Sequence, residues 1–220
     1  MVSSEIITVG LALAIGVYSA LRPYTLADNI ITALSFILYS MPIFWIALSL
    51  LWIFSVTFKQ AGLPYLPTVG MYEPGSPVTL LELLRHMIMP VLSLSLISVA
   101  GYSRYVRAAL LEVINADYIR TAYSKGLSKR RILWSHALKN ASLPLVTLIG
   151  LDLPFLLGGA VVTEQIFAWP GMGQLFVNSL DRADFPVLMG LLMLIAVLVV
   201  LFQIITDIVY AWLDPRIRLS

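Results

Sequence analysis

Long uncharged apolar runs dominate the chain. A helix needs roughly 20 residues to cross about 30 Å of hydrocarbon, and five runs approach or exceed that length. We therefore expect membrane-spanning helices at residues 6–21, 29–58, 86–103, 143–162 and 185–213. Apolar and polar residues do not alternate at period two within these runs, which argues against an outer-membrane barrel. The pattern predicts an all-α, polytopic membrane protein in which residues 1–220 form a single transmembrane domain.

Three details refine this prediction. The first run rises only about 24 Å, and Glu5 precedes it where a signal peptide would carry basic residues, so it is interpreted as a short spanning helix. Pro42 lies near the middle of the second run and predicts a kink that neighbouring helices can absorb. Residues 61–70 are rich in Gly and Pro and predict an ordered external loop.

Composition excludes several other classes of protein. Residues of the set AVILMFWYC make up 60% of the chain and charged residues only 12%, and the mean hydropathy is +0.91. A soluble globular domain and a disordered chain are both incompatible with these values. The absence of cysteine excludes a disulfide scaffold. The net charge of +2 provides no basic field for a nucleic-acid partner.

The basic residues are unevenly distributed. Eight of the fourteen lie in one connection between predicted helices: Arg104, Arg107, Arg120, Lys125, Lys129, Arg130, Arg131 and Lys139. By the positive-inside rule this connection, residues 104–142, is cytoplasmic. Alternation of the spans then places residues 22–28 and the C-terminus in the cytoplasm as well.

The connection 104–142 also has a helical pattern of its own. Apolar residues recur at spacings of three and four from Val106 to Ile114 and again from Leu133 to Ala141, which predicts two short amphipathic helices. Between them, Gly126 can adopt the positive φ of a sharp turn, and Ser128 can cap the following helix. Such a turn suits the groove of a partner protein. Attraction of the basic residues to anionic membrane lipid remains a second explanation for their clustering.

The segment DYIRTAYSKGLSKRRILWSHALKNASLP, residues 117–144, resembles the EAA loop of ABC-importer permeases of the dipeptide/oligopeptide/nickel branch. Arg120, Thr121 and Ala122 stand where Glu-Ala-Ala is usual, residues 136–139 stand where Ile-x-Leu-Pro is usual, and Gly126 keeps its spacing. The stretches 163–174, 184–186 and 207–218 resemble the same branch, so the similarity covers nearly the whole chain.

The resemblance implies an ABC transporter type-1 transmembrane domain in a bacterial inner membrane. It implies a permease that forms a path with a second related permease, docks on two cytosolic ABC ATPase subunits and receives peptide from an extracytoplasmic binding protein. Docking is expected through residues of the loop: Asp117, Tyr118, Arg120, Thr121, Ala122, Lys125, Gly126 and Leu127. Permeases of this branch carry one more N-terminal helix, which predicts that the natural subunit begins upstream of Met1. The resemblance does not distinguish among dipeptide, oligopeptide, glutathione and chelated nickel as cargo.

Candidate catalytic and cofactor sites are absent from the sequence. No Gly-x-x-x-x-Gly-Lys-Ser/Thr motif occurs, so ATP and Mg²⁺ are expected on the partner ATPase subunits rather than on this chain. His86 and His136 have no second ligand at metal-binding spacing. We therefore expect no catalytic, cofactor-binding or metal-binding residue and no enzymatic activity.

Asp152 is the most unusual residue of the predicted spans, because it lies at the middle of the run 143–162. A charge at the bilayer centre costs about 2.5–3.5 kcal/mol on insertion scales, so the side chain should face the bundle interior, a polar cavity or a basic partner. Pro154 loosens the backbone beside it. A structural carboxylate and a position on the translocation path, shared with Pro154, both remain open.

Two rival functions also remain open. An ion-coupled secondary transporter would use Asp152 and Asp207 as coupling carboxylates. A non-transporting membrane scaffold would use the basic loop only to bind lipid or a soluble protein. The resemblance of residues 117–144 to an EAA loop favours the permease over both.

Overall fold

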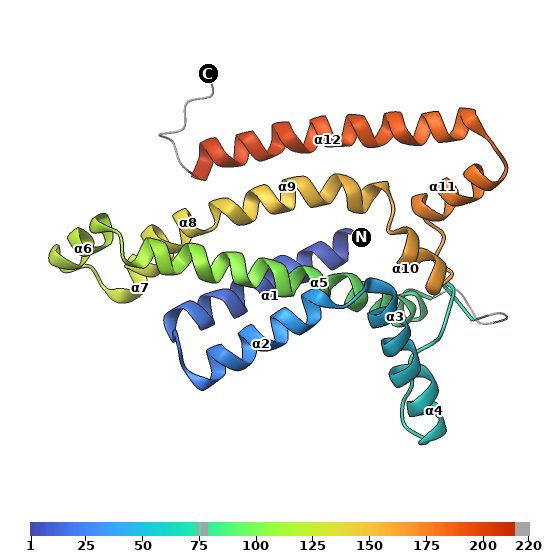
Figure 1. The fold of residues 1–220 in the computed structure, drawn as a ribbon, viewed down its shortest axis with the longest axis horizontal. Helices are drawn as coiled ribbons and strands as arrows, with labels where there is room; N and C mark the ends of the chain where they lie inside the picture. The colour runs from blue at the N-terminus through green and yellow to red at the C-terminus, as the bar shows by residue number, and fades with distance from the viewer. Residues whose placement is uncertain (74, 76–78, 214–220) are drawn as a thin grey trace.

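The computed structural model describes residues 1–73, 75 and 79–213, and this part of the chain is helical and contains no strand (Figure 1). Four helical stretches are long and apolar enough to cross a membrane: α1 (Val2–Leu21), the stretch Ile43–Gln60, α5 (Leu80–Ile114) and α12 (Phe185–Leu213). A fifth span is possible if residues 129–141 and α9 (Leu143–Gly158) count as one segment bent by 44°. The all-α membrane architecture predicted from the apolar runs is confirmed.

The bounds of the second predicted span, 29–58, are wrong. α2 (Leu26–Ser40) ends before Met41, and a new helix, α3 (Ile43–Leu51), begins after Pro42. Proline lacks an N–H donor and disfavours helical geometry in the residue before it, and Met41 is accordingly extended. Pro42 therefore breaks the run instead of kinking it, and Figure 1 shows α3 turning steeply away from α2. The π-helix η1 (Trp52–Thr57) and α4 (Phe58–Gln60) continue from α3.

The third predicted span, 86–103, is only the middle of a longer helix. α5 runs from Leu80, which Thr79 caps by accepting from Glu82 N at 3.2 Å, to Ile114. The predicted amphipathic helix from Val106 to Ile114 is therefore the last part of α5. It is followed by α6 (Asp117–Ser124), which the sequence pattern had not separated from it.

The second amphipathic helix is present as predicted, in three consecutive pieces. These are α7 (Lys129–Ile132), the π-helix η2 (Leu133–Ala137) and α8 (Leu138–Ala141). The fourth predicted span, 143–162, ends too late, because Gly159 adopts φ +121° and terminates α9 at Gly158. The short helices α10 (Val161–Ile166) and α11 (Met172–Asp181) follow. α12 occupies the predicted residues 185–213.

Two pairs of helices form the body of the molecule. α1 lies along α5, and α9 lies along α12 (Figure 1). Small residues allow the first pair to approach closely: a Cβ on Gly16 would lie 2.8 Å from the carbonyl oxygen of Ser103. Gly150 does the same for the second pair, where its missing side chain makes room for Thr206.

Of the remaining helices, α2 runs alongside α1 and α5, and the others gather at the two ends of this body (Figure 1). α6, α7 and α8 lie at one end, here termed the loop end, where α1, α5 and α12 also terminate (Figure 1). α3, α10 and α11 lie at the opposite end. The loop 61–70 is ordered there, as predicted, because Leu66 N donates to Phe54 O at 3.0 Å and Gly70 N donates to Phe167 O at 2.7 Å.

Candidate functional site

The helices of the loop end pack through one shared apolar cluster. Ile119 and Ala122 of α6 are buried against Ile132 of α7 and against Leu110 of α5. Ala20, at the end of α1, belongs to the same cluster. The apolar stripe predicted for the loop is therefore turned toward the ends of two long helices, so α6 and α7 are fixed to the helical body.

Gly126 closes α6 in the geometry predicted from the sequence. It adopts φ +75°, and its N–H donates to Tyr123 O at 2.9 Å. Leu127 N donates to Ala122 O at 3.3 Å, which completes a Schellman motif, and Leu127 packs on the apolar cluster, a contact that often accompanies this motif. Ser128 then caps α7 by accepting from Arg131 N at 3.4 Å. The reversal is thus specified by backbone bonds at both helix termini.

The outer face of the loop is aromatic and basic. Tyr118, Tyr123 and Trp134 are exposed, with 60% of Trp134 accessible. Arg120, Thr121 and Lys125 are also exposed. Asp117 and Arg120 approach to 3.8 Å, but both side chains are exposed, so this pair contributes little to stability. The loop presents large side chains and positive charge on a face that nothing in the described chain covers.

One hydrogen-bond link ties the two halves of the loop together. Asn140 Nδ2 donates to the Tyr118 hydroxyl at 3.1 Å and to His136 O at 3.0 Å. The link joins α8 to the start of α6. Of the loop residues singled out in the sequence, Ala122 and Leu127 therefore support the fold, while Tyr118, Arg120, Thr121, Lys125 and Gly126 lie at the surface.

Asp152 lies far from the loop, in the middle of the helical body. Its Oδ2 accepts a hydrogen bond of 2.5 Å from the Tyr102 hydroxyl of α5. The Glu5 carboxyl of α1 lies beside both groups, and among the described residues its Oε1 finds no hydrogen-bond partner. Glu5 and Tyr102 are buried, whereas Asp152 is half-buried. Pro154 is buried two residues further along and does not join this cluster.

A buried ion pair connects α2 to α5 close to the loop end. Asp28 is only 1% exposed and binds Arg107 bidentately, with Nε to Oδ1 at 2.8 Å and Nη2 to Oδ2 at 2.7 Å. Ser19 Oγ donates to Oδ1 at 2.7 Å, and Tyr24 N donates to Oδ2 at 2.8 Å. The hydrogen bonds from Arg107 hold the pKa of the Asp28 carboxyl well below its usual range.

Sequence reasoning missed the partners in both of these clusters. Glu5 lies in the first turn of α1 and Asp28 in the first turn of α2, so each carboxylate was visible as an unusual charge at the start of an apolar run. Arg107 follows Asp28 by 79 residues, and Tyr102 follows Glu5 by 97 residues and precedes Asp152 by 50, so no local pattern relates these partners. Asp207, the other candidate coupling carboxylate, accepts at Oδ1 from Gln203 Nε2 at 3.4 Å. Arg216 and Arg218, the basic residues nearest to it further along the chain, lie outside the described residues.

Comparison with known families gives one match that covers most of the chain. Residues 12–219 match the family described as binding-protein-dependent transport system inner membrane component. The loop 104–142, Asp152 and the described end of α12 all fall inside the matched region.

Individual relatives extend the match to the whole chain. The oligopeptide transport system permease protein AppB of Bacillus subtilis is 43% identical over 99% of this chain and 67% of its own length. The di/tripeptide permease protein DppB of Pseudomonas aeruginosa is 39% identical over 92% of this chain and 64% of its own. The dipeptide permease protein DppB of Escherichia coli is 34% identical over 99% and 69%. The chain thus spans about two thirds of the length of these relatives.

Proposed function

The chain belongs to the family of binding-protein-dependent transport system inner membrane components, and from this premise we propose that it is the permease subunit of an ATP-driven peptide importer. Dipeptides or oligopeptides are the proposed cargo, because three relatives that match nearly all of this chain are named for their transport. The chain supplies membrane-spanning helices and no ATPase activity of its own.

The proposed assembly contains several further chains. The four or five spanning helices of the described residues are too few to enclose a path for a peptide, so a second, related permease completes it. Two cytosolic ATPase subunits bind ATP and Mg²⁺, and an extracytoplasmic binding protein delivers the peptide. The loop end faces the cytoplasm, together with the C-terminus, because the basic residues concentrate there.

The observation that carries this proposal is the construction of the loop around Gly126. Reversing the equilibrium between two states of a transporter from about 1:99 to about 99:1 requires about 5.5 kcal/mol. A loosely tethered loop could not transmit this free energy from an ATPase to the membrane helices. Here the Schellman motif and the shared apolar cluster fix α6 to α5 and α1, while Tyr123 and Lys125 remain free to contact a partner. We assign the outer face of residues 117–127 to ATPase docking.

Asp152 is proposed to border the translocation path, with Pro154 beside it. Its half-buried carboxylate is held by the Tyr102 hydroxyl, and the remaining accessible part is available to a second permease or to cargo. A carboxylate at this depth is expensive unless it faces such an environment.

One observation favours a second candidate function, an ion-coupled transporter. Glu5, Tyr102 and Asp152 bring two carboxyl groups and a hydroxyl together inside the helical body, as ion coupling would require. Uptake that follows an ion gradient in the absence of any ATPase subunit would favour this function. Uptake that requires ATP and the ATPase pair would favour the permease.

The test of the proposal replaces Gly126. Nothing lies within 4 Å of a Cβ built at this position, so a substitution changes only the backbone preference. A left-handed conformation costs an L-residue roughly 1–2 kcal/mol and is still less accessible to a β-branched residue. Gly126→Val should therefore open the turn, whereas Gly126→Asn, which tolerates positive φ, is the matched control.

We expect Gly126→Val to keep normal membrane abundance, because no spanning helix is changed. Co-purification of the ATPase subunits and substrate-stimulated ATP hydrolysis should fall about five- to thirtyfold, the factor that corresponds to 1–2 kcal/mol. Gly126→Asn should remain close to the unsubstituted importer. Full coupling and full transport by Gly126→Val would remove the role assigned to this turn.

A further inference from the structure

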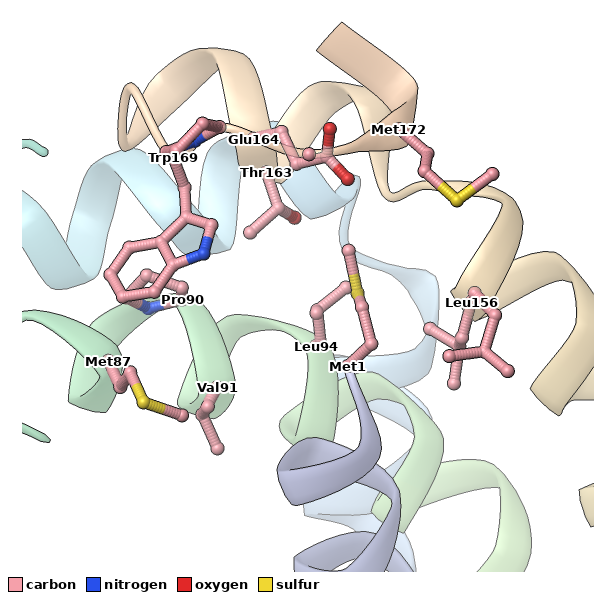
Figure 2. A pocket seen from close by; sticks show the side chains of 13 residues that line it. Met1, Met87, Pro90, Val91, Leu94, Leu156, Thr163, Glu164, Trp169 and Met172 are labelled. Atoms are coloured by element: carbon pink, nitrogen blue, oxygen red, sulfur yellow. The ribbon is translucent and has the colours of Figure 1, made fainter. Parts of the chain in front are cut away.

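A cavity of about 250 Å³ lies at the end of the molecule opposite the loop. α5 contributes Met87, Pro90 and Leu94 to its wall, α9 contributes Leu156, and the connection between α10 and α11 contributes Trp169. Figure 2 shows these side chains arranged around one space, with the Trp169 ring beside Pro90. The wall is predominantly apolar and comes from four separate parts of the chain, because Met1, at the start of α1, also lines it between Leu94 and Leu156.

One polar group in this wall lacks a partner. Thr163 is only 2% exposed, and its Oγ1 forms no hydrogen bond within the described part of the chain. Figure 2 shows its side chain reaching from α10 into the space between Trp169 and Leu94. A buried hydroxyl without a hydrogen-bond partner is destabilising, so a ligand that hydrogen-bonds to Thr163 would remove this penalty.

The carboxylate of the next residue, Glu164, already accepts hydrogen bonds from backbone N–H groups. Glu164 accepts from Ala160 N at 3.1 Å through Oε1 and from Gln174 N at 2.7 Å through Oε2. Gly171 leaves the room that this carboxylate fills. Glu164 therefore fixes the connection from α10 to α11, and Thr163 Oγ1 is the polar atom beside the cavity that has no hydrogen-bond partner among the described residues.

The dimensions and chemistry of the cavity indicate its occupant. Pockets for whole drug-sized ligands measure about 300–1,000 Å³, so a cavity of this size holds one part of a larger ligand. Methionine side chains such as Met87 and Met172 adapt to apolar groups of different shape, as a site with varied ligands requires. A lipid chain would fill the space but has no group to bond the Thr163 hydroxyl, whereas a peptide offers both an apolar side chain and a backbone amide.

We propose that this cavity receives one apolar side chain of a peptide in transit and that the Thr163 hydroxyl hydrogen-bonds the adjoining peptide group. The inference rests on the proposed import of peptides and adds a subsite to it. The site selects for apolar side chains of moderate size through the volume enclosed by α5, α9 and Trp169.

The test fills the cavity and removes the hydroxyl in separate variants of the assembled importer. Leu156→Phe adds volume at the cavity wall, and Leu151→Phe makes the same change at an exposed position of the same helix. Thr163→Val removes the hydroxyl at nearly constant shape, and Thr163→Ser retains it. Initial uptake of Gly-Gly, Ala-Leu and Ala-Phe is measured in proteoliposomes with one binding protein throughout, and each rate is divided by that of the unsubstituted importer.

We expect Leu156→Phe to lower the ratios for Ala-Leu and Ala-Phe about tenfold relative to Gly-Gly, the usual scale for steric discrimination in an apolar pocket. Leu151→Phe should leave all ratios equal. Thr163→Val should reduce uptake of the apolar peptides about three- to tenfold, the equivalent of one hydrogen bond, and Thr163→Ser should restore most of it.

The failures of the two proposals can be told apart. An unsubstituted importer that takes up neither these three dipeptides nor longer peptides with the same side chains would overturn the proposed function and this inference together. Peptide uptake that Leu156→Phe reduces equally for all three peptides, or that Thr163→Val leaves unchanged, would overturn the inference alone. Should Leu156→Phe fail to assemble, the comparison of Thr163→Val with Thr163→Ser decides the question.

Discussion

The ion pair between Asp28 and Arg107 gives the sharpest quantitative prediction from the structure. Asp28→Asn and Arg107→Met each remove one charge, and the double substitution removes both. The two partners differ in accessibility, because Asp28 is 1% exposed whereas the Arg107 side chain is 24% exposed. The energetic cost of the single substitutions should therefore be unequal.

Removing one partner of a buried pair costs about 3–5 kcal/mol, mainly because the other charge is left buried without compensation. Arg107→Met leaves the carboxylate of Asp28 fully enclosed, with only Ser19 Oγ and Tyr24 N as donors, so we expect a loss near the upper figure. Asp28→Asn leaves the guanidinium of Arg107, which can reach water, and should cost near the lower figure or less. The double variant should be more stable than Arg107→Met alone, because it contains no uncompensated carboxylate.

The free energy of unfolding can be measured by titrating the protein in lipid bicelles with SDS. The pKa of Asp28 is lowered in the folded state, so its contribution is present above the unfolded value of about 3.9 and disappears only as pH falls through the lower folded-state pKa. The difference between Asp28→Asn and the unsubstituted protein should thus stay constant from about pH 5 to about pH 8. Additive losses in the double variant, or equal losses in the two single variants, would refute this reasoning.

Two further predictions concern the helical body. Asp152→Asn keeps an acceptor for the Tyr102 hydroxyl but removes the charge, so transport should fall by about tenfold, the equivalent of 1.4 kcal/mol. Membrane abundance should stay within about twofold of that of the exposed control Asp181→Asn. Normal transport by Asp152→Leu would contradict a role on the path. Gly150→Val places a side chain where Thr206 lies and should lower the unfolding free energy by about 1–3 kcal/mol, whereas Gly190→Val, which meets no atom within 4 Å, should not reproduce this loss of packing.

The helical architecture could be predicted because the bilayer imposes a length and a polarity on each spanning helix. The apolar run 185–213 meets no competing signal, and α12 occupies those residues. The predicted helix bounds were wrong where a proline, a glycine or an N-terminal cap ended or extended a helix independently of the apolar run. Pro42 separated α2 from α3, Gly159 terminated α9, and the Thr79 cap started α5 before the uncharged residues begin.

The turn at Gly126 could be predicted because its geometry depends only on residues within five positions along the chain. The contacts of Asp152 were not predictable, because Glu5 and Tyr102 approach it only through the packing of α1 and α9 against α5. The cavity beside Thr163 also depends on tertiary packing, as its wall joins segments separated by about 70 residues of chain. Local chemistry therefore specified the loop, while the buried polar groups required the three-dimensional structure.

α5 links all of these features, and its composition bears on how the proposed importer could transmit motion. Its 35 residues extend about 52 Å. Met87, Pro90 and Leu94, in its first half, line the cavity. Tyr102 lies about two thirds of the way along it, and Arg107 and Leu110 anchor the loop end. Pro90 lies in the cavity wall and removes one backbone hydrogen bond, so the helix is weakest there and continuous from Pro90 to the loop. A displacement of α6 by docked ATPase subunits would thus move the segment from Pro90 to Ile114 as one rigid body. The helix would bend at Pro90, in the wall of the cavity where the peptide is proposed to bind.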